Sequence, residues 1–333
     1  MHLPAPTRRR PSGEGALAPV DPELVRRNRA ASKAGETKRA LLKNWALFER
    51  WCADSGETPL PAAPETVERF LLYLSDAHAV RDRAGRELRR GLKPSAVGQA
   101  LWAVNSRHRL AGLPAPGEAA LVKTALAGIR RRKGTRPKQQ APLTIAHLLA
   151  ARFGDDLKSR RDKALLLVGF AGCLRRSELV ALRVEHVEET PLGLRVFVPR
   201  SKTDQEGTGA WVDLLRATRY PTLCPVAALL EWLAAAGIGE GPLFRSLRKG
   251  RAQRLGAALA AASVDAIVKR VAAACGLDAA RYGGHSLRAG QATWLSEQGK
   301  SPTLIARHGR WKSLNMVLTY CRGETARELA GAY

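Results

Sequence analysis

Apolar residues recur at intervals of three and four along four segments within residues 34–129. In chain order they are Leu41, Leu42, Trp45, Phe48 and Trp51; Val67, Phe70, Leu71 and Leu74; Val97, Leu101 and Val104; and Leu121, Val122, Ala125, Leu126 and Ile129. This spacing places the apolar side chains on one face of an α-helix, and the Pro-Glu-Thr sequence at Pro64 is a typical helix start. The pattern predicts an all-α N-terminal domain of four to five helices. The domain holds no nucleophile beside a base and no metal cluster, so we expect it to bind rather than catalyse.

Residues 142–333 are also mostly helical in pattern, with one β interruption. The longest apolar run of the chain, residues 164–174, predicts a buried helix, because eleven residues are too few to span a bilayer. Residues 194–198 and 210–214 alternate in the manner of strands around a glycine-containing turn. The predicted fold class is therefore mainly α, with a small antiparallel β-sheet inside an α-rich C-terminal domain.

A basic segment joins the two predicted domains at residues 130–141. Its cations are Arg130, Arg131, Arg132, Lys133, Arg136 and Lys138. Gly134 and Pro137 interrupt helix formation there. A solvated hinge and a strap lying along nucleic-acid phosphates are the two competing interpretations. The charge of the whole chain favours a strap that is also a hinge.

That charge is strongly positive. The 333 residues include 55 Lys and Arg against 30 Asp and Glu, a net charge of +25. Such an excess repels itself unless the protein meets a polyanion, and nucleic acid is the commonest one. A surface that serves solubility alone usually mixes the two signs more evenly.

The N-terminus and the cysteines bear on where the protein works. Residues 1–33 are rich in Pro, Arg, Ala and Gly without helical periodicity, which predicts a flexible arm with no signal-peptide core. The five cysteines, Cys52, Cys173, Cys224, Cys275 and Cys321, are scattered and form no Cys-x-x-Cys pair. Their distribution argues against disulfides and zinc and fits a reducing cytoplasm.

Four segments of the C-terminal half hold side chains suited to a phosphodiester. In chain order the residues are Arg175 and Glu178 after the apolar run, Lys202 between the predicted strands, His285 and Arg288, and finally Trp311 and Tyr320. An Arg just beyond a buried helix can present its planar fork to two phosphate oxygens. An ammonium at a hairpin tip can protonate a leaving oxygen. A His and an Arg three residues apart share one face of a helix.

Each signal alone has a plainer explanation. The charged run at residues 175–178 is more often a solvated face, and a hairpin Lys usually serves solubility. A His-x-x-Arg pair occurs by chance in many helices, and a Tyr near a C-terminus is most often a packing residue. The combination and its order are much more specific than any member.

In that order, the four segments resemble the tyrosine recombinase (phage integrase) family, and most closely its Cre-like members. The resemblance runs from about residue 33 to residue 320 and is strongest at the catalytic boxes. It puts the family's catalytic positions on Arg175, Glu178, Lys202, His285, Arg288, Trp311 and Tyr320. The Leu-Arg-x-x-Glu pattern selects Arg175 over Arg176, and the nine-residue interval before Tyr320 selects Trp311 over His308. The N-terminal helical domain (34–129) resembles the family's core-binding domain, and residues 142–333 resemble its catalytic domain.

The resemblance implies a division of roles among these residues. Tyr320 would be the nucleophile that forms a 3′-phosphotyrosyl bond, Lys202 would protonate the departing 5′ oxygen, and His285 would help to take the tyrosine proton. The two guanidiniums would clamp the scissile phosphate. Trp311 would donate its indole N–H, and Glu178 would orient Arg175 or His285.

The resemblance also implies partners. We expect double-stranded DNA with specific recombination sites, a homotetramer on two paired sites and a Holliday-junction intermediate. No cofactor and no metal is expected, since the sequence has neither a Walker motif nor a carboxylate cluster. A cytoplasmic, nucleoid-associated protein of bacterial, phage or plasmid origin fits these features, and no membrane is involved.

Two other functions remain open. A type IB topoisomerase-like enzyme uses the same chemistry to nick and reseal one duplex, but the helical N-terminal domain and the boxes at Arg175, His285 and Trp311 favour recombination. A degenerate family member would only bind DNA. The presence of every expected catalytic residue argues against that reading.

Overall fold

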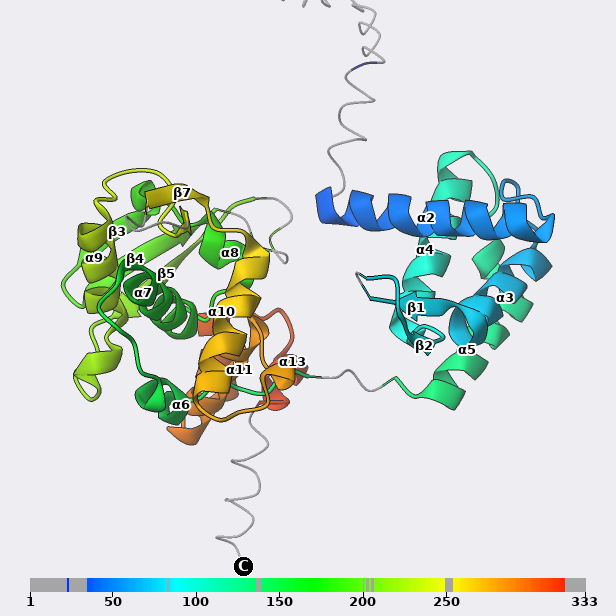
Figure 1. The fold of residues 1–333 in the computed structure, drawn as a ribbon. Coiled ribbons are helices and arrows are strands. Elements are labelled where there is room, and N and C mark those ends of the chain that lie inside the picture. The colour runs from blue at the N-terminus through cyan, green and yellow to red at the C-terminus, as the bar shows by residue number, and fades with distance from the viewer. Residues whose placement is uncertain are drawn as a thin grey trace, which may run out of the picture. The chain divides into compact units, whose positions relative to one another are not determined.

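The computed structural model describes residues 23, 35–82, 84–135, 139–199, 201, 204, 207–248 and 254–320. The chain divides into two compact units, Met1–Pro137 and Lys138–Tyr333, drawn as a ribbon in Figure 1. Each unit has its own buried apolar core. The secondary structure is mostly helical with small antiparallel sheets, which confirms the predicted fold class. Within the described ranges, no helix combines the length and apolar character needed to cross a membrane.

Four α-helices build the described part of the N-terminal unit, one on each segment with helical spacing. They are α2 (Gly35–Ser55), α3 (Pro64–Leu72), α4 (Pro94–Leu110) and α5 (Ala120–Lys133), with a π-helical turn η1 (Tyr73–Ala77) after α3 and a 3-10 turn η2 (Pro116–Glu118) before α5. Proline opens α3 and α4, where its missing N–H costs no helical hydrogen bond. The apolar faces meet at Phe48 and Phe70, both fully buried, with ring centroids 4.9 Å apart. The predicted helices are confirmed.

A short hairpin in this unit has no counterpart in the predicted elements. Strands β1 (Ala79–Arg81) and β2 (Glu87–Arg90) pair antiparallel. Asp82 closes the turn by accepting the N–H groups of Ala84 at 2.9 Å and Arg86 at 3.0 Å. The strands are short and mostly charged, so they lack the apolar alternation from which a strand is recognised.

The basic segment begins as helix rather than as linker. Residues 130–133, placed in the linker by the sequence analysis, form the last turn of α5. Arg and Lys are good helix formers, and cations are favoured at a helix C-terminus by its dipole. The helix ends at Gly134, whose φ of +70° lies in the region that glycine adopts easily.

In its described part, the C-terminal unit wraps several helices around one buried helix. The helices are α6 (Ile145–Ala150), α7 (Leu157–Ala171), α8 (Arg176–Ala181), α9 (Pro225–Ala236), α10 (Ala261–Ala274), α11 (His285–Glu297), α12 (Pro302–Gly309) and α13 (Leu314–Leu318), with 3-10 turns η3 (Val184–His186), η4 (Pro221–Leu223) and η5 (Ala279–Arg281). Asp156 caps α7 by accepting the N–H groups of Lys158 and Ser159 at 3.0 and 3.2 Å.

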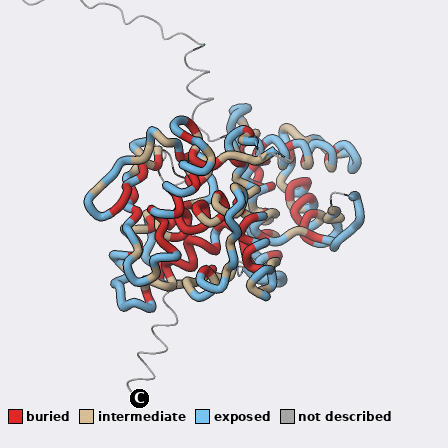
Figure 2. Tube along the Cα trace, turned by 60° about the vertical axis from the view of Figure 1, so that its left-hand side comes forward, coloured by how far each residue is buried: buried red, intermediate tan, exposed pale blue. Residues whose placement is uncertain are grey.

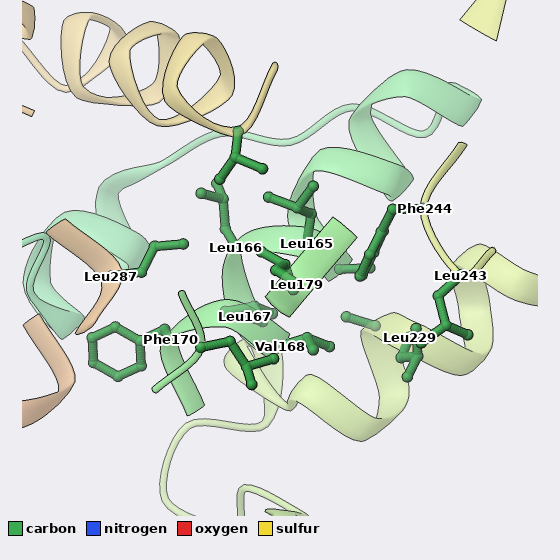
Figure 3. Close-up of a cluster of buried hydrophobic side chains, with 14 of the residues drawn as sticks. Leu165, Leu166, Leu167, Val168, Phe170, Leu179, Leu229, Leu243, Phe244 and Leu287 are labelled. Atoms are coloured by element: carbon green, nitrogen blue, oxygen red, sulfur yellow. The ribbon is translucent and has the colours of Figure 1, made fainter. Parts of the chain in front are cut away.

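Helix α7 is the centre of this core. Its residues 164–170 are buried on every side, as the continuous apolar run predicts. Figure 3 shows Leu165, Leu166 and Val168 among side chains from other elements, including Leu229 of α9 and Leu287 of α11. Buried positions gather in the interior in Figure 2. Burying one such side chain contributes roughly 1.5–3 kcal/mol, so α7 is a rigid base for the turn that follows it.

Two antiparallel sheets complete the described part of this unit. Strands β3 (Val187–Thr190), β4 (Gly193–Val198) and β5 (Ala210–Leu215) form one sheet in the order β3-β4-β5. The β4–β5 pair is the predicted hairpin, with Val196 opposite Val212, and β3 is an additional edge strand. A second sheet pairs β6 (Arg245–Arg248) with β7 (Arg254–Ala258).

Candidate active site

The turn between α7 and α8 is the first segment of the site along the chain. The N–H of Cys173 donates to the carbonyl of Phe170 at 3.0 Å, and that of Leu174 to Gly169 at 3.0 Å, so the chain reverses tightly. Cys173 has a φ of +48°, a left-handed conformation that costs a non-glycine residue about 1–2 kcal/mol. Its thiol is buried, and burial raises the pKa of that thiol to about 11, so it is an unreactive core group.

Arg175 and Glu178 form a pair at the start of α8. Arg175 is the N-cap residue, and its N–H donates to Glu178 Oε2 at 3.0 Å while its Nη1 donates to Oε1 at 2.6 Å. The Glu178 side chain is 1% exposed and that of Arg175 is 14% exposed. Burial alone would raise the pKa of Glu178, but the Arg175 N–H and the neighbouring guanidiniums hold this pKa below its ordinary value. Glu178 is therefore an ionised carboxylate that holds the Arg175 guanidinium in place.

Arg288 lies in the interior, on α11. It is 1% exposed, and its Nη1 donates to the carbonyl of Cys173 while its Nη2 donates to the carbonyl of Gly309 at 2.7 Å. The residue thus joins the turn after α7 to the end of α12. Burial lowers the pKa of Arg288 from its ordinary value, yet a guanidinium stays protonated in proteins. The site holds a fixed positive charge.

Trp311 packs against this guanidinium, and Tyr320 packs against Trp311. The Cζ of Arg288 lies 4.3 Å from the centroid of the Trp311 ring, a cation–π contact. The Trp311 and Tyr320 ring centroids are 5.8 Å apart, inclined at 45°. Gly309 makes room for the indole, since a Cβ there would lie 1.8 Å from it. Trp311 therefore contacts both the Arg288 guanidinium and the Tyr320 ring.

Tyr320 is half-buried, and its surroundings act on its pKa in opposite directions. Burial raises the pKa of the phenol, and the positive charge of Arg288 partly opposes that rise. The phenol is therefore neutral near pH 7 in this structure. It must lose its proton to a base if it is to act as a nucleophile.

His285 is on the same helix as Arg288 but at the surface. It is the first residue of α11, one turn before Arg288, and it is exposed. Its backbone N–H donates to Gln140 Oε1 at 3.0 Å, and the preceding Gly284 N–H donates to Asp265 Oδ1 at 2.7 Å. The start of α11 is thereby fixed to two other segments. His285 and Arg288 lie one turn apart on α11, with His285 exposed and Arg288 buried.

Several predicted residues fall elsewhere. Lys202 lies outside the described residues, between Ser201 and Asp204, which form a β-bridge in the β4–β5 connection. Arg136 and Lys138 are outside them as well, as are residues 1–22 and the tail after Tyr320. The predicted DNA-binding residues Arg130, Arg131, Arg132 and Lys133 belong to the other unit, at the end of α5.

One residue that the sequence analysis did not single out lies inside the site. Arg310 donates from Nη2 to Glu178 Oε2 at 2.8 Å. The two residues are 132 positions apart in the chain, and no motif spacing indicates the contact. His308, set aside as a neighbour of Trp311, contacts the Ala171 carbonyl through Nε2 at 2.8 Å. Burial lowers the pKa of His308, so it is a neutral packing residue here.

The arrangement suits an anion attacked by a phenol. Arg175 and Arg288 supply fixed guanidiniums, and Tyr320 packs against Trp311, which lies over the Arg288 guanidinium. Over the residues that the structure describes, no group of three or more His, Cys, Asp or Glu side chains is placed to hold a metal ion. The chemistry available from these side chains is electrostatic stabilisation, proton transfer and attack by an oxygen nucleophile.

Comparison with known proteins identifies the family. Residues 144–327 match the Phage integrase family. The integrase/recombinase xerD homolog of Selenomonas ruminantium is 35% identical over 302 residues, which cover 89% of this chain and 84% of that protein. Recombinase cre of Escherichia phage P1 is 26% identical over 304 residues, which cover 85% of this chain and 82% of that protein.

Solved structures share the fold. The XerH site-specific recombinase in a post-cleavage complex with palindromic difH substrate has a TM-score of 0.55 at 16% identity, over 81% of this chain and 71% of that chain. A lambda integrase dimer bound to a COC′ core site has a TM-score of 0.54 at 16% identity, over 90% and 93%. The chain belongs to the phage integrase family of tyrosine recombinases. It is a site-specific recombinase, and both Xer-type and Cre relatives match it.

Proposed function

We propose that this recombinase cuts and rejoins DNA through a 3′-phosphotyrosyl intermediate, with Tyr320 as the nucleophile. The observation that carries the proposal is the contact of Trp311 with both Tyr320 and Arg288, in the site that also holds the Arg175–Glu178 pair. A phosphodiester resists attack because its anionic oxygens repel nucleophiles and its alkoxide leaves poorly. Fixed cations, a positioned nucleophile and a proton donor overcome these two obstacles.

In the proposed step, the phenolic oxygen of Tyr320 bonds to the scissile phosphorus while the bond from phosphorus to the 5′ oxygen breaks. His285 takes the phenol proton, and Lys202 gives a proton to the departing 5′ oxygen. The phosphotyrosyl ester retains the energy of the broken diester, so a free 5′ hydroxyl on another strand reverses the step without ATP.

The remaining site residues act on the phosphate. Arg175 and Arg288 neutralise the non-bridging oxygens as charge builds up in the transition state, and loss of one such preorganised contact costs about 10²–10³ in rate. Trp311 donates its indole N–H to the phosphate and packs against the nucleophile. Glu178 holds the Arg175 guanidinium in place.

Double-stranded DNA is the proposed partner. Residues 34–129 act as the core-binding domain, 130–141 as the linker and 142–333 as the catalytic domain, while residues 1–33 form a flexible arm. The net charge of +25 and the DNA-bound relatives of the same fold support this assignment. The cations that contact the backbone are Arg130, Arg131, Arg132, Lys133, Arg136 and Lys138. Four protomers on two sites exchange strands through a Holliday junction, in the cytoplasm.

A paired-site assay tests this function. Binding sites are selected from random genomic fragments, and two copies are placed in one supercoiled plasmid. We expect deletion or inversion products that require both copies, because strands must pass between sites. Relaxation of a single-site plasmid without any recombinant product would overturn the proposal and indicate a topoisomerase-like activity.

A further inference from the structure

Arg310 occupies a conformation that an arginine seldom adopts. Its φ is +55°, and with Cys173 it is one of two non-glycine residues with positive φ in the described part of the chain. Both border the site, on either side of Arg288, which bonds to the Cys173 carbonyl. Glycine would fit this position without strain. Backbone strain of this kind persists where the surrounding structure holds it and gathers at functional sites.

The side chain of Arg310 turns back to the buried carboxylate. Its Nη2 donates to Glu178 Oε2 at 2.8 Å, the same oxygen that accepts the Arg175 N–H at 3.0 Å. Nη1 makes long contacts of 3.5 Å to the carbonyls of Gly172 and His308. Nε is buried without a hydrogen-bond partner. Arg310 therefore combines a left-handed backbone with a buried unpaired donor, and it forms its ion pair with Glu178.

The charges around Glu178 determine how the Arg310–Glu178 contact affects the net charge of the site. Arg175 and Arg310 each pair with the carboxylate, and Arg288 is the third cation of the site. Among these four described side chains, three guanidiniums against one carboxylate leave two positive charges for an incoming phosphate. Without Arg310 only one would remain, and an anionic carboxylate behind Arg175 would repel the phosphate through a low-dielectric interior.

We propose that Arg310 is a positioning residue for strand cleavage, which neutralises Glu178 so that Arg175 keeps both its orientation and its charge for the scissile phosphate. The inference rests on the proposed function, since it concerns the same phosphate. Glu178 then holds Arg175 in its orientation without cancelling the positive charge of Arg175. Arg310 itself contacts the carboxylate and acts through Arg175.

The test compares three variants by single-turnover formation of the covalent protein–DNA complex, on a nicked duplex that carries the selected site. Arg310→Gly suits the left-handed backbone, so we expect it to fold and to bind DNA within about twofold of wild type. We expect its cleavage rate to fall about tenfold to hundredfold. Arg310→Lys supplies a charge of the same sign and recovers most of the rate.

The double variant Glu178→Gln/Arg310→Gly separates charge from packing. It restores the excess of two positive charges and cleaves faster than Arg310→Gly alone, whereas a merely structural role would make the second substitution an added defect. Arg307→Ala is the matched control, because it removes an exposed cation from α12, the helix whose C-cap is Arg310. Its rate stays near that of wild type.

Two results would overturn the inference. One is Arg310→Gly cleaving at the wild-type rate; the other is a double variant no faster than that single variant. Both are read against a wild-type protein that does form the covalent complex. If wild type forms none on a site that it binds, the proposed function itself fails, and the two failures are thereby distinguished.

Discussion

Glu178 shows how a buried charge can serve chemistry without being the reacting group. Its carboxylate is 1% exposed and accepts bonds from the Arg175 N–H, the Arg175 guanidinium and the Arg310 guanidinium. Desolvation opposes ionisation, and these donors outweigh it, so the pKa of Glu178 lies below its ordinary value. The carboxylate therefore stabilises the folded protein in its charged form.

The pH dependence of stability tests that statement. A carboxyl whose pKa is lowered on folding stabilises the native state above its unfolded pKa, and the contribution disappears as the pH falls through the folded pKa. We expect Glu178→Gln to lower the free energy of unfolding by about 3 kcal/mol above pH 5, since it leaves two guanidiniums without their counter-charge. The difference from wild type should shrink below about pH 4. Urea unfolding at a series of pH values measures it, and a pH-independent difference would contradict the account.

At this scale the sequence predicts which side chains gather in the C-terminal unit better than it predicts the surroundings of each one. Residue type and interval point to Arg175, Arg288, Trp311 and Tyr320, and the structure brings these four together with Glu178. Intervals along the chain do not show how deeply a side chain is buried. His285 and Arg288 share a helix face, but one is exposed and the other buried. The Arg310–Glu178 contact depends on a left-handed backbone turn that no motif encodes.

Among the elements, helices with a clear apolar face were predictable and short charged strands were not. α2, α3, α4, α5 and α7 follow apolar periodicity or a continuous apolar run. The β1–β2 hairpin is stabilised instead by its turn and by backbone contacts at its base. Gly91 is needed there, because a Cβ would lie 1.9 Å from the Ser75 carbonyl oxygen. Tertiary contacts of this kind produce no periodic pattern of apolar residues in the sequence.

At the scale of elements, the prediction concerns the cations at the end of α5. Arg132 is paired with Asp76 at 2.9 Å, and Lys133 donates to the Ser75 carbonyl. The neighbouring cations Arg130 and Arg131 are exposed, so they are better placed to exchange counterions for phosphates. We expect Arg130→Ala/Arg131→Ala to weaken DNA binding and to reduce the slope of log affinity against log salt by about two units.

The control for that experiment removes the same charge elsewhere. Arg183→Ala/Arg195→Ala deletes two exposed cations that are paired with Glu185 and Glu188 in the C-terminal unit. Its salt slope should equal that of wild type in a fluorescence anisotropy titration. Equal slopes for both double variants and the wild type would contradict a phosphate contact at α5.

For the whole molecule, two compact units and a large positive charge fit a protein that acts on a polyanion. The N-terminal unit contributes a helical body with a basic end, and the C-terminal unit contributes the cluster around Arg288. Family membership was recognisable because the residue types expected at the family's catalytic positions occur in the family's order along the second unit. The target sequence depends on side chains at base edges, which that order does not specify.

The most direct measurement identifies the residue that carries the DNA. The covalent complex is trapped on a nicked duplex labelled on either side of the nick, digested with trypsin and analysed by mass spectrometry. We expect a 3′-phosphoryl linkage to the tryptic peptide 313–322, at Tyr320, and no covalent complex from a Tyr320→Phe variant that still binds DNA. A linkage at any other residue, a 5′-phosphoryl linkage, or a complex formed by Tyr320→Phe would contradict it.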